Sequence, residues 1–347
     1  MKQILPVIMD AAFERLAIID DYISIIWTTR YYTPGDFELC LAADPKYMDI
    51  IRADYYITRD DDENVGIIED IKIQRTEDAQ DLLIVTGRFL SSILERRIIA
   101  TQTTLSGKVS DCISQLITDN IISPEILDRE IPDFILGTYS TTETMDAQYT
   151  GKNLLATVTD ICQTYGLGHK VTLDAFHRFV FELYRGADRT YNQSVNPWVI
   201  FSDKYDNLLS SEYEENYKTL KTAVLVAGEG EGLERRTVWL TNGESGLDRR
   251  EVYKDQRQLR SNGGEISDAD YEAMLEEAGK EDLTDYTTAF SGTVYFDNIR
   301  YKQDVKIGDL CVIENSAWGI YINSRLVEVI ESISETGEYN IIPTFGI

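Results

Sequence analysis

The sequence contains only two histidines, His169 and His177, among 347 residues. It lacks the G-x-S-x-G and H-E-x-x-H motifs, and it offers no cysteine and histidine pair that would suggest a nucleophile and its base. Histidine is the usual general base near neutral pH and a common zinc ligand. Catalysis by histidine and zinc bound by histidine therefore have little material in this chain.

Cysteine is also scarce. The four cysteines lie far apart in the chain and never form C-x-x-C: Cys40, Cys112, Cys162 and Cys311. Each lies in a segment with apolar periodicity, which favours a buried thiol over a disulfide or a metal ligand. This usage is typical of a protein made in a reducing compartment such as the bacterial cytoplasm.

Basic residues are few relative to acids. Thirty-three Lys and Arg against 60 Asp and Glu give a formal net charge of -27. Such a field opposes every contact to a phosphate, so it argues against binding DNA, RNA or an anionic membrane through charge. It favours high solubility or a surface that repels polyanions. The length is enough for two or three domains.

Long apolar runs are absent as well. No stretch of about 18 apolar residues exists, so we expect no membrane insertion. The apolar run at residues 4–9 is interrupted by Pro6 and followed by Asp10 and Glu14. No A-x-A cleavage site follows it, so the segment does not fit a secretory signal peptide.

Alternation is the first positive signal. In residues 24–41, SIIWTTRYYTPGDFELCL, apolar and polar residues alternate on both sides of Pro34-Gly35. Proline and glycine fit the two central positions of a type II turn, so the stretch predicts a hairpin. Further strands are predicted at 55–58, 65–73 and 81–89, with acidic turns between them. We therefore predict an N-terminal domain, 1–103, that forms a small barrel or sandwich of strands.

The period changes in residues 104–190. Apolar residues at helical spacing predict a helix near 109–117, with Ser106 as its cap. A second helix is predicted at 154–165, with Gly166 at the position of a left-handed C-cap. Two hairpin strands follow it in the sequence. This segment is predicted to be an α+β domain.

Residues 191–347 return to strands. One helix interrupts them near 271–279, preceded by the capping-box pair Ser267 and Asp270. The segment before this helix is polar and rich in turns. We predict a C-terminal β-barrel domain, 191–347, with a helical and loop insertion around 242–285.

A weak internal repeat joins the two ends of the chain. Aligning Phe37 with Gly292 places Asp54 on Asp309 without a gap, and similar strand patterns follow both. The predicted fold class is therefore α+β, mainly β, with two related small β-barrel domains flanking an α+β insert.

Three glycines after a predicted strand, Gly228, Gly230 and Gly232, suggest a nucleotide-binding loop. Their spacing is G-x-G-x-G, and a strand-like segment follows where a helix would be required. Glu229 and Glu231 would also repel a pyrophosphate. We expect a glycine-rich hairpin or a subunit-contact loop here, and no cofactor.

The acidic turn at 59–66, RDDDENVG, places Asp60, Asp62 and Asn64 at the first, third and fifth positions of a calcium loop. Val65 stands where that loop needs glycine, and Ile71 stands where it needs a bidentate glutamate. We expect a solvated hairpin tip and no bound metal. The arginine doublets of the chain each follow an acid, which favours local salt bridges or subunit contacts.

The opening hairpin carries a family resemblance. The pattern W-x-x-R-Y-Y-x-x-G-x-F-E-L resembles the signature of the ReqiPepy-type siphovirus tail proteins of phages and prophages. The matching positions, of which the first six named are our candidate assembly residues, are Trp27, Arg30, Tyr31, Tyr32, Gly35, Phe37, Glu38 and Leu39. The aromatic residues before the turn fit a subunit contact and a buried core strand equally well.

The family in turn resembles the baseplate hub proteins of long-tailed phages, which carry two related β-barrels per chain and assemble as trimers. The resemblance implies a non-catalytic structural protein of the virion, a homotrimeric hub that joins the tail tube to the tip. Implied partners are the distal tail protein, the tape-measure protein and a tip fibre or lysin, with DNA only passing through the lumen. Many tail-tip proteins continue into a lysin domain, whereas this sequence ends at PTFGI.

Two other functions stay open from the residues alone. One is a cell-wall polysaccharide hydrolase or carbohydrate-binding tail protein, using Tyr and Trp platforms and a carboxylate pair. Nothing singles out two of the 60 acids for such a pair. The other is a β-rich scaffold or adhesin unrelated to tails.

Overall fold

The computed structural model describes residues 3–77, 80–262, 266–294 and 299–346. The chain is mainly β, with 41% in strands and 20% in helices, which confirms the mainly β prediction. It divides into two compact units. The main unit comprises Met1–Ser211 and Gly292–Ile347, and the inserted unit comprises Glu212–Ser291. The three-domain division at 1–103, 104–190 and 191–347 stays a prediction.

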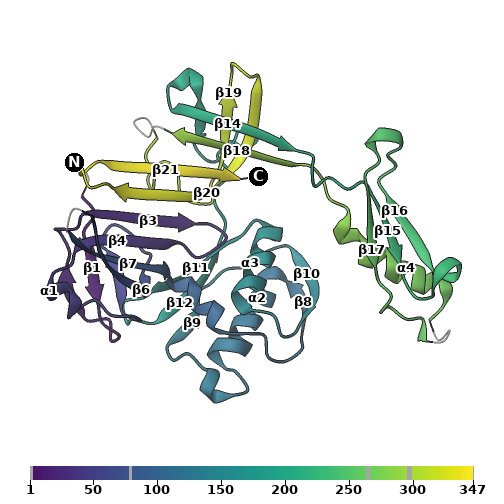
Figure 1. Cartoon of the computed structure of the whole chain (residues 1–347), viewed down its shortest axis with the longest axis horizontal. Coiled ribbons are helices and arrows are strands. Elements are labelled where there is room, and N and C mark those ends of the chain that lie inside the picture. Colours follow the sequence, from purple (N-terminus) through teal and green to yellow (C-terminus); the bar gives the residue numbers. More distant parts are fainter. Residues whose placement is uncertain (1–2, 78–79, 263–265, 295–298, 347) are drawn as a thin grey trace. The chain divides into compact units, whose positions relative to one another are not determined.

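One large sheet organises the main unit. Within the described residues it contains thirteen strands, with the order β14-β18-β21-β20-β3-β4-β7-β6-β5-β1-β2, and with β13 paired to β19 and β19 to β20 beside this path. Figure 1 shows β21, β20, β3 and β4 lying one beside the next. No closed barrel is found among the described residues, so the two small β-barrels stay a prediction.

The sheet strands before residue 100 are β1 (Pro6–Met9), β2 (Arg15–Ile18), β3 (Ser24–Arg30), β4 (Asp36–Ala42), β5 (Tyr56–Arg59), β6 (Gly66–Arg75) and β7 (Asp81–Phe89), with the short helix α1 (Pro45–Met48). The later ones are β13 (Ile200–Ser202), β14 (Leu208–Asn216), β18 (Thr287–Val294), β19 (Leu310–Asn315), β20 (Ile320–Ile333) and β21 (Tyr339–Gly346).

The predicted hairpin at the start of the chain is confirmed as β3 and β4. Its strands pair antiparallel, with Trp27 opposite Phe37. Both side chains are buried in a core cluster that also contains Phe89, whose ring centroid lies 4.7 Å from that of Trp27. Burial of such large aromatic side chains is the main stabilising contribution of the hairpin.

The predicted type II turn is wrong in one respect. Gly35 is not among the residues with positive φ, which a type II turn would require at this position. Glycine is required at this position because there is no space for a Cβ atom. A Cβ at Gly35 would lie 2.1 Å from the carbonyl oxygen of Thr28 and 2.5 Å from the ring of Phe89. Glycine is therefore needed because the turn packs directly on its own hairpin.

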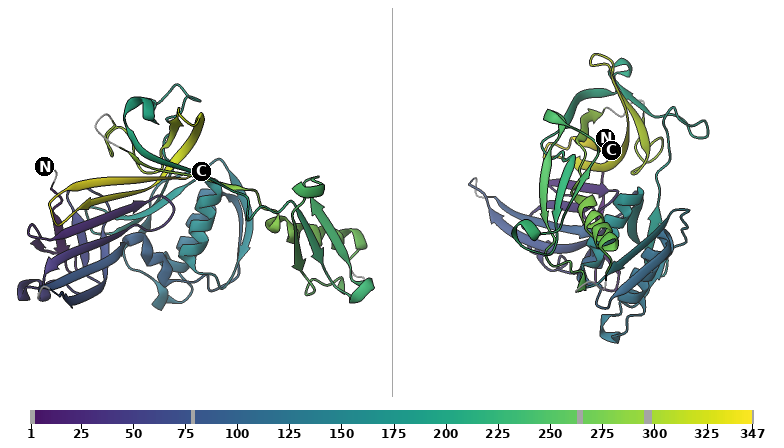
Figure 2. Two further views of the ribbon diagram at one scale, coloured as in Figure 1. Left: turned by 45° about the horizontal axis from the view of Figure 1, so that its top comes forward. Right: turned by 90° about the vertical axis from the view of Figure 1, so that its right-hand side faces the viewer.

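Between the strands of the sheet the chain forms an α+β insert. Its elements are β8 (Thr103–Lys108), α2 (Val109–Ile117), β9 (Phe134–Leu136), β10 (Thr144–Tyr149), α3 (Leu154–Tyr165), β11 (Gly168–Leu173) and β12 (Phe179–Tyr184). Helix α2 packs against β8 and β10, and α3 against β11 (Figure 2). The buried residues of both helices share one apolar cluster.

The helix caps were predicted with mixed success. Gly166 ends α3 in the left-handed conformation, with φ of 63°, as predicted. At the other end, the side chain of Asn153 accepts a hydrogen bond from the Ala156 N–H. The predicted cap at Ser106 is wrong because Ser106 pairs with Asp146 within the β8–β10 ladder. Strand pairing therefore extends to the start of α2.

The inserted unit has its own small core. Its strands are β15 (Ala223–Ala227), β16 (Thr237–Thr241) and β17 (Glu251–Asp255), and its helix is α4 (Asp268–Gly279). The predicted cap at Ser267 is confirmed, since its hydroxyl accepts a hydrogen bond from the Asp270 N–H and donates one to the Asp270 carboxylate. Helix α4 covers one face of the three-stranded sheet with Tyr271 and Leu275, which pack on Val224 and Val226.

An internal repeat is visible in the strand order. The order β3-β4-β7-β6-β5 in the first half matches β14-β18-β21-β20-β19 in the second, and the two sets also follow the same order along the chain. We call these five-strand sets the first and second repeat. The inserted unit begins within β14 and ends within β18, and residues 217–286 connect these two strands where the first repeat has only the turn 31–35.

The match extends to individual hydrogen bonds. Both second hairpins, β6–β7 and β20–β21, contain one bulge, between Ile68 and Asp70 and between Leu326 and Glu328. In the first repeat Ile68 donates to Tyr55 and accepts from Asp54. In the second repeat, the Leu326 N–H donates to the Asp309 carbonyl oxygen, and the Leu326 carbonyl oxygen accepts from the Gly308 N–H. The two partners are consecutive residues in both repeats.

The same hydrogen bonds correct the alignment derived from the sequence. The counterpart of Asp54 is Gly308, and both have positive φ, 61° and 89°. The predicted match of Asp54 with Asp309 is thus wrong by one residue. A gapless alignment cannot represent the difference of one residue between the segment that leads from Phe37 to Asp54 and the segment that leads from Gly292 to Gly308.

Candidate assembly site

The two repeats meet at one strand pair within the main unit. Residues 328–333 of β20 pair antiparallel with residues 25–30 of β3. The Tyr31 N–H extends this ladder by donating to the Val327 carbonyl oxygen at 2.9 Å. The family motif therefore lies at the junction between the repeats.

Arg30 connects both sides of this junction. Its guanidinium donates to Glu328 on β20 at 2.6 Å, to Asp36 on β4, and to the Pro34 carbonyl oxygen at 3.2 Å. Burial alone would lower the pKa of Arg30, but the hydrogen bonds to Asp36 and Glu328 outweigh it and raise the pKa. The side chain stays charged and fixes the turn against β20.

Tyr31 is the point where three parts of the main unit meet. Its side chain is fully buried, and its hydroxyl donates to the Gly166 carbonyl oxygen of the insert at 3.0 Å. Gly168 and Gly308 lie so close to the ring that a Cβ on either would be within 2.5 Å of it. Burial also raises the pKa of Tyr31. The ring therefore locks the first repeat onto both the insert and the second repeat.

Beside Tyr31's hairpin lies a buried network of charges. Arg59 and Glu331, each 1% exposed, form an ion pair at 3.2 Å. Arg59 also forms an ion pair with Asp61. The Lys302 ammonium lies 3.1 Å from a carboxylate oxygen of Glu331 and 2.6 Å from one of Asp62. Burial lowers the pKa of Arg59, but its hydrogen bonds to Asp61 and the negative charge of Glu331 raise it overall. Breaking such a network leaves a buried charge without its partner, which is costly.

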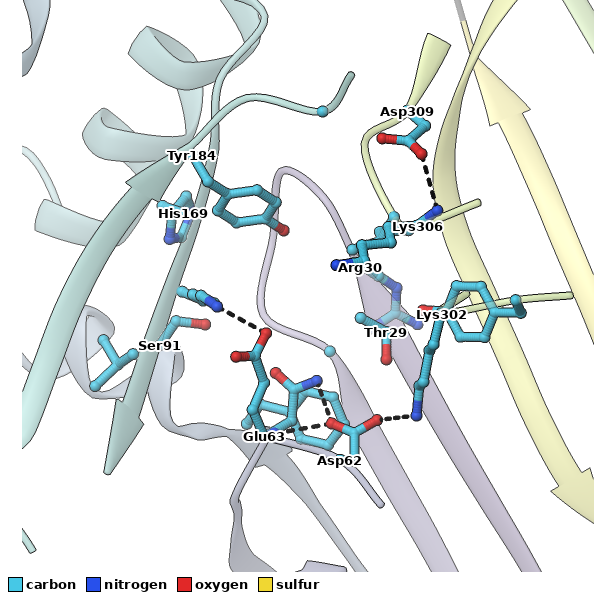
Figure 3. A pocket seen from close by; sticks show the side chains of 18 of the residues that line it. Thr29, Arg30, Asp62, Glu63, Ser91, His169, Tyr184, Lys302, Lys306 and Asp309 are labelled. Atoms are coloured by element: carbon cyan, nitrogen blue, oxygen red, sulfur yellow. Dashed lines mark hydrogen bonds and ion pairs between the residues drawn. The ribbon is translucent and has the colours of Figure 1, made fainter. Parts of the chain in front are cut away.

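A cavity of about 960 Å³ lies next to this network (Figure 3). His169 and Tyr184 of the insert border it on one side, and Lys302 and Lys306 border it on the other. All five acids that border it form ion pairs with basic side chains: Asp60 with Arg15, Asp61 with Arg59, Asp62 with Lys302, Glu63 with Lys170, and Asp309 with Arg189. The arrangement stabilises the junction and presents no isolated pair of carboxylates.

His169 is a buried polar group of the insert. It is 1% exposed, and its Nδ1 has no hydrogen-bond partner within the described part of the chain. Its Nε2 lies 3.5 Å from the Thr159 hydroxyl. Burial lowers the pKa of His169 to about 4. The imidazole is therefore neutral over the physiological range.

The candidate residues from the sequence all lie in one hairpin, but in different environments. Trp27, Tyr31 and Phe37 are buried within the chain, whereas Arg30 and Tyr32 are partly exposed. Their role in assembly stays a prediction. The three buried side chains could affect assembly only by holding the hairpin in its conformation.

The charge network was not predicted from the sequence. The turn at 59–66 was expected to be a solvated tip, but the Asp62 side chain is 2% exposed and accepts from Asn64 and Lys302. The available signal was the alternation of Glu331 with Val329 and Ile333, which places an acid on the same face of the strand as two buried apolar residues. Among the described residues, no group of three or more His, Cys, Asp or Glu side chains could hold a metal ion.

Other features flagged in the sequence form local structure. The glycine-rich loop joins β15 to β16 as an antiparallel hairpin, as expected. The doublet arginines Arg235, Arg236 and Arg249 form local ion pairs, for example with Asp255 and Glu251. All four cysteines are buried and free. Over the described ranges, no helix is both long and apolar enough to cross a bilayer.

Comparison with known proteins gives the chain a family. Residues 5–347 match the family described as Siphovirus ReqiPepy6 Gp37-like protein. No curated protein sequence matches. Three similar solved structures are a tail protein from Neisseria meningitidis MC58, the 43 kDa tail protein of prophage MuSo2 from Shewanella oneidensis, and the prophage tail protein gp18 from Listeria monocytogenes EGD-e.

These structures share the fold across almost their whole length. The Neisseria protein has a TM-score of 0.59 at 14% identity, covering 100% of this chain and 97% of its own. The Shewanella protein has 0.57 at 15%, covering 99% and 98%, and the Listeria protein has 0.52 at 13%, covering 98% and 94%. The family match over nearly every residue shows that this chain belongs to the ReqiPepy6 Gp37-like family of siphovirus tail proteins.

Proposed function

We propose that the chain is a structural hub of a phage or prophage tail tip, in which three copies form a ring between the tail tube and the tip. The internal repeat carries this proposal. Two matching sets of strands per chain supply six similar segments in a trimer, which suits a protein that must meet a tube of six-fold symmetry. Two small β-barrels per chain would be the form that these segments take in the ring.

The site chemistry supports a role without catalysis. A carboxylate that acts as a general acid must keep a proton near neutral pH, which needs an apolar or like-charged environment. Each acid at the cavity instead faces a lysine or arginine at ion-pair distance, such as Glu63 with Lys170 at 2.7 Å and Asp309 with Arg189 at 2.6 Å. These ion pairs favour a structural role for the acids.

The partners follow from this position in the tail. We infer contacts with the distal tail protein, the tape-measure protein and a tip fibre or lysin. The net charge of -27 would let DNA pass the lumen without binding to it. Reversal of lumen acids to lysine is expected to slow DNA ejection, and an unchanged ejection rate would contradict this part of the proposal.

Light scattering coupled to size-exclusion chromatography tests the assembly. The chain has a mass of 39.6 kDa, and the proposal expects particles of three chains. Electron microscopy of the same fraction should show a ring with three-fold symmetry. Closed rings of another stoichiometry, or localisation of the chain away from the tip in intact tails, would overturn the hub role.

One observation favours a second candidate function, saccharide binding by the inserted unit. Leu225 lies opposite both Trp239 and Tyr253 in the three-stranded sheet, and both aromatic residues are about half exposed. An aromatic row of this kind can stack on sugar rings. Binding of purified cell-wall polysaccharide that Trp239→Ala abolishes would support this function, and no binding would exclude it.

A further inference from the structure

One edge of the first repeat is open. Residues 70–75 of β6 pair with β7 on one side. On the other side, no strand of the described residues pairs with them. Five of these six residues are exposed, and Ile73 is 54% exposed. Exposed edge strands with apolar side chains are normally covered, since they invite pairing with another chain.

The second repeat shows what covers the same edge. The counterparts of residues 70–75 are residues 328–333 of β20, since both stretches start just after the bulge and end at the hairpin loop. Residues 328–333 are paired with β3 on the equivalent side. None of them is exposed. The β20–β3 pairing within the chain therefore shows how a strand can cover the edge that is open in β6.

The register also shows which groups of β6 point outward. The Tyr31 N–H donates to Val327, so alternate residues of β20 from Val327 onward face β3. In β6 the residue that matches Val327 is Glu69. The N–H groups of Ile71 and Ile73 therefore face the open side, whereas that of Lys72 faces β7.

We propose that the open edge of β6, residues 70–75, pairs with strand β14 of a second copy of this chain. The partner of the equivalent edge in β20 is β3, and the counterpart of β3 in the second repeat is β14, which ends the strand order of the sheet. The contact between chains thus repeats the β20–β3 contact within the chain. This inference rests on the proposed ring and names the strands that close it.

Charge complementarity supports the pairing. The edge at 70–75 contains Lys72 and Arg75 and only one acid. Strand β14 carries three exposed acids, Glu212, Glu214 and Glu215, and no base. Because two different surfaces meet, the contact runs head to tail, and such contacts generate a closed ring when the rotation between successive copies closes. Pairing of β6 with β6 would instead place Lys72 near its own copy.

Disulfide trapping in the full-length chain tests the strand pairing. Lys72→Cys is combined in turn with a cysteine at each position of β14, residues 208–216; the native cysteines are buried. We expect crosslinks between chains at alternate positions only, because side chains alternate across a sheet. The crosslinked species should end at a closed trimer. Crosslinks at no position, or a dimer formed by Lys72→Cys alone, would overturn the inference.

A pair of proline variants tests the edge without cysteines. Ile73→Pro removes an outward N–H, so we expect a fall in mass from three chains to one, with an unchanged circular dichroism spectrum because the fold of each chain is kept. Ile73→Ala is the matched control and should keep the trimer. Lys72→Pro removes an inward N–H and should lower the melting temperature.

The outcomes separate the inference from the proposed function. A wild-type trimer that Ile73→Pro leaves intact would refute the β6–β14 contact while preserving the hub. A chain that stays monomeric and uncrosslinked at its highest soluble concentration would refute the contact as well. The hub role would then be judged independently, by whether intact tails contain the chain at their tip.

Discussion

The hairpins β6–β7 and β20–β21 have the same backbone and different surroundings. Each has one bulge at the equivalent position, and each closes its loop with the same hydrogen bond, from Thr76 to Gln80 and from Ser334 to Glu338. Residues 328–333 of β20 are covered by β3, whereas residues 70–75 of β6 have no partner strand on the equivalent side within the described ranges. The backbone is therefore the repeated part, whereas the side chains differ according to what each edge contacts.

Ile73 and Glu331 show this difference at one position. Ile73 is 54% exposed in the first repeat, and its counterpart Glu331 is 1% exposed in the second. The usual preference is reversed, since the apolar residue faces solvent and the charged one is buried. Glu331 is buried because Arg59 and Lys302 bind it. The apolar exposed residue is the one that would gain from a partner chain.

Exchanging these two residues should give the largest effect. Glu331→Ile leaves Arg59 and Lys302 without a shared buried acid, and we expect a loss of about 4 kcal/mol in the free energy of unfolding. Ile73→Glu on the monomer should change it by no more than about 0.5 kcal/mol. Urea unfolding of both variants measures the difference. Equal losses would contradict the assignment of the two edges.

The left-handed position before the bulge should respond almost as strongly. Gly308→Ala places a Cβ within 2.2 Å of the Tyr31 ring at a φ of 89°, and we expect a loss of about 3 kcal/mol. At the matching position, Asp54→Gly relieves a positive φ and removes only an exposed ion pair with Arg96. That change should stay within about 1 kcal/mol. Thermal unfolding compares the two, and a tolerated Gly308→Ala would break the comparison.

Acid should weaken the insert without altering either hairpin. The folded pKa of His169 is about 4, below the ordinary 6.5, so the unfolded chain binds the additional proton between these values. Stability is therefore complete above pH 6.5 and falls as the pH decreases toward 4, by about 2 kcal/mol at pH 5.

The matched variant is His169→Met, which should flatten this part of the pH profile of the unfolding midpoint. His177→Met serves as the control and should leave the slope in place. A wild-type midpoint that does not change between pH 6.5 and 5 would contradict the burial of a neutral imidazole.

The bulge residues should give the smallest effect. Glu69 in β6 binds the partly exposed Arg88 at 2.8 Å, whereas its counterpart in β20 is Val327. Glu69→Val makes the two bulges alike and should cost about 0.5 kcal/mol, because Arg88 keeps Glu95 as a partner. A loss several times larger, measured by urea unfolding, would show that the bulge depends on its side chain.

Local signals predicted much of the fold. Alternation around Pro34-Gly35 indicated β3 and β4, and the caps at Gly166 and Ser267 marked the ends of their helices. In each case the residues that determine the element lie within a few positions of one another. The Ser106 cap failed because strand pairing with β10, a longer-range contact, outweighed a local preference.

The site was less predictable because it depends on contacts distant in the sequence. Arg59 and Glu331 are separated by 272 positions, and no periodicity within either segment indicates that they pair. The sequence around Asp62 predicted a turn residue in solvent, but in the structure Lys302, 240 positions away, covers its carboxylate. The repeat itself was detectable, but a gapless alignment could not represent a difference of one residue in the segments that precede Asp54 and Gly308.

The inserted unit breaks the equivalence of the repeats at one turn. The first repeat joins its first two strands with residues 31–35, and the second repeat joins them with residues 217–286, which make up most of the inserted unit. A circle of three chains would hold six hairpins of the β6–β7 kind but only three inserted units. Segments with and without an inserted unit would then alternate around the ring. A single insertion in each chain would therefore be enough to reduce six-fold to three-fold symmetry.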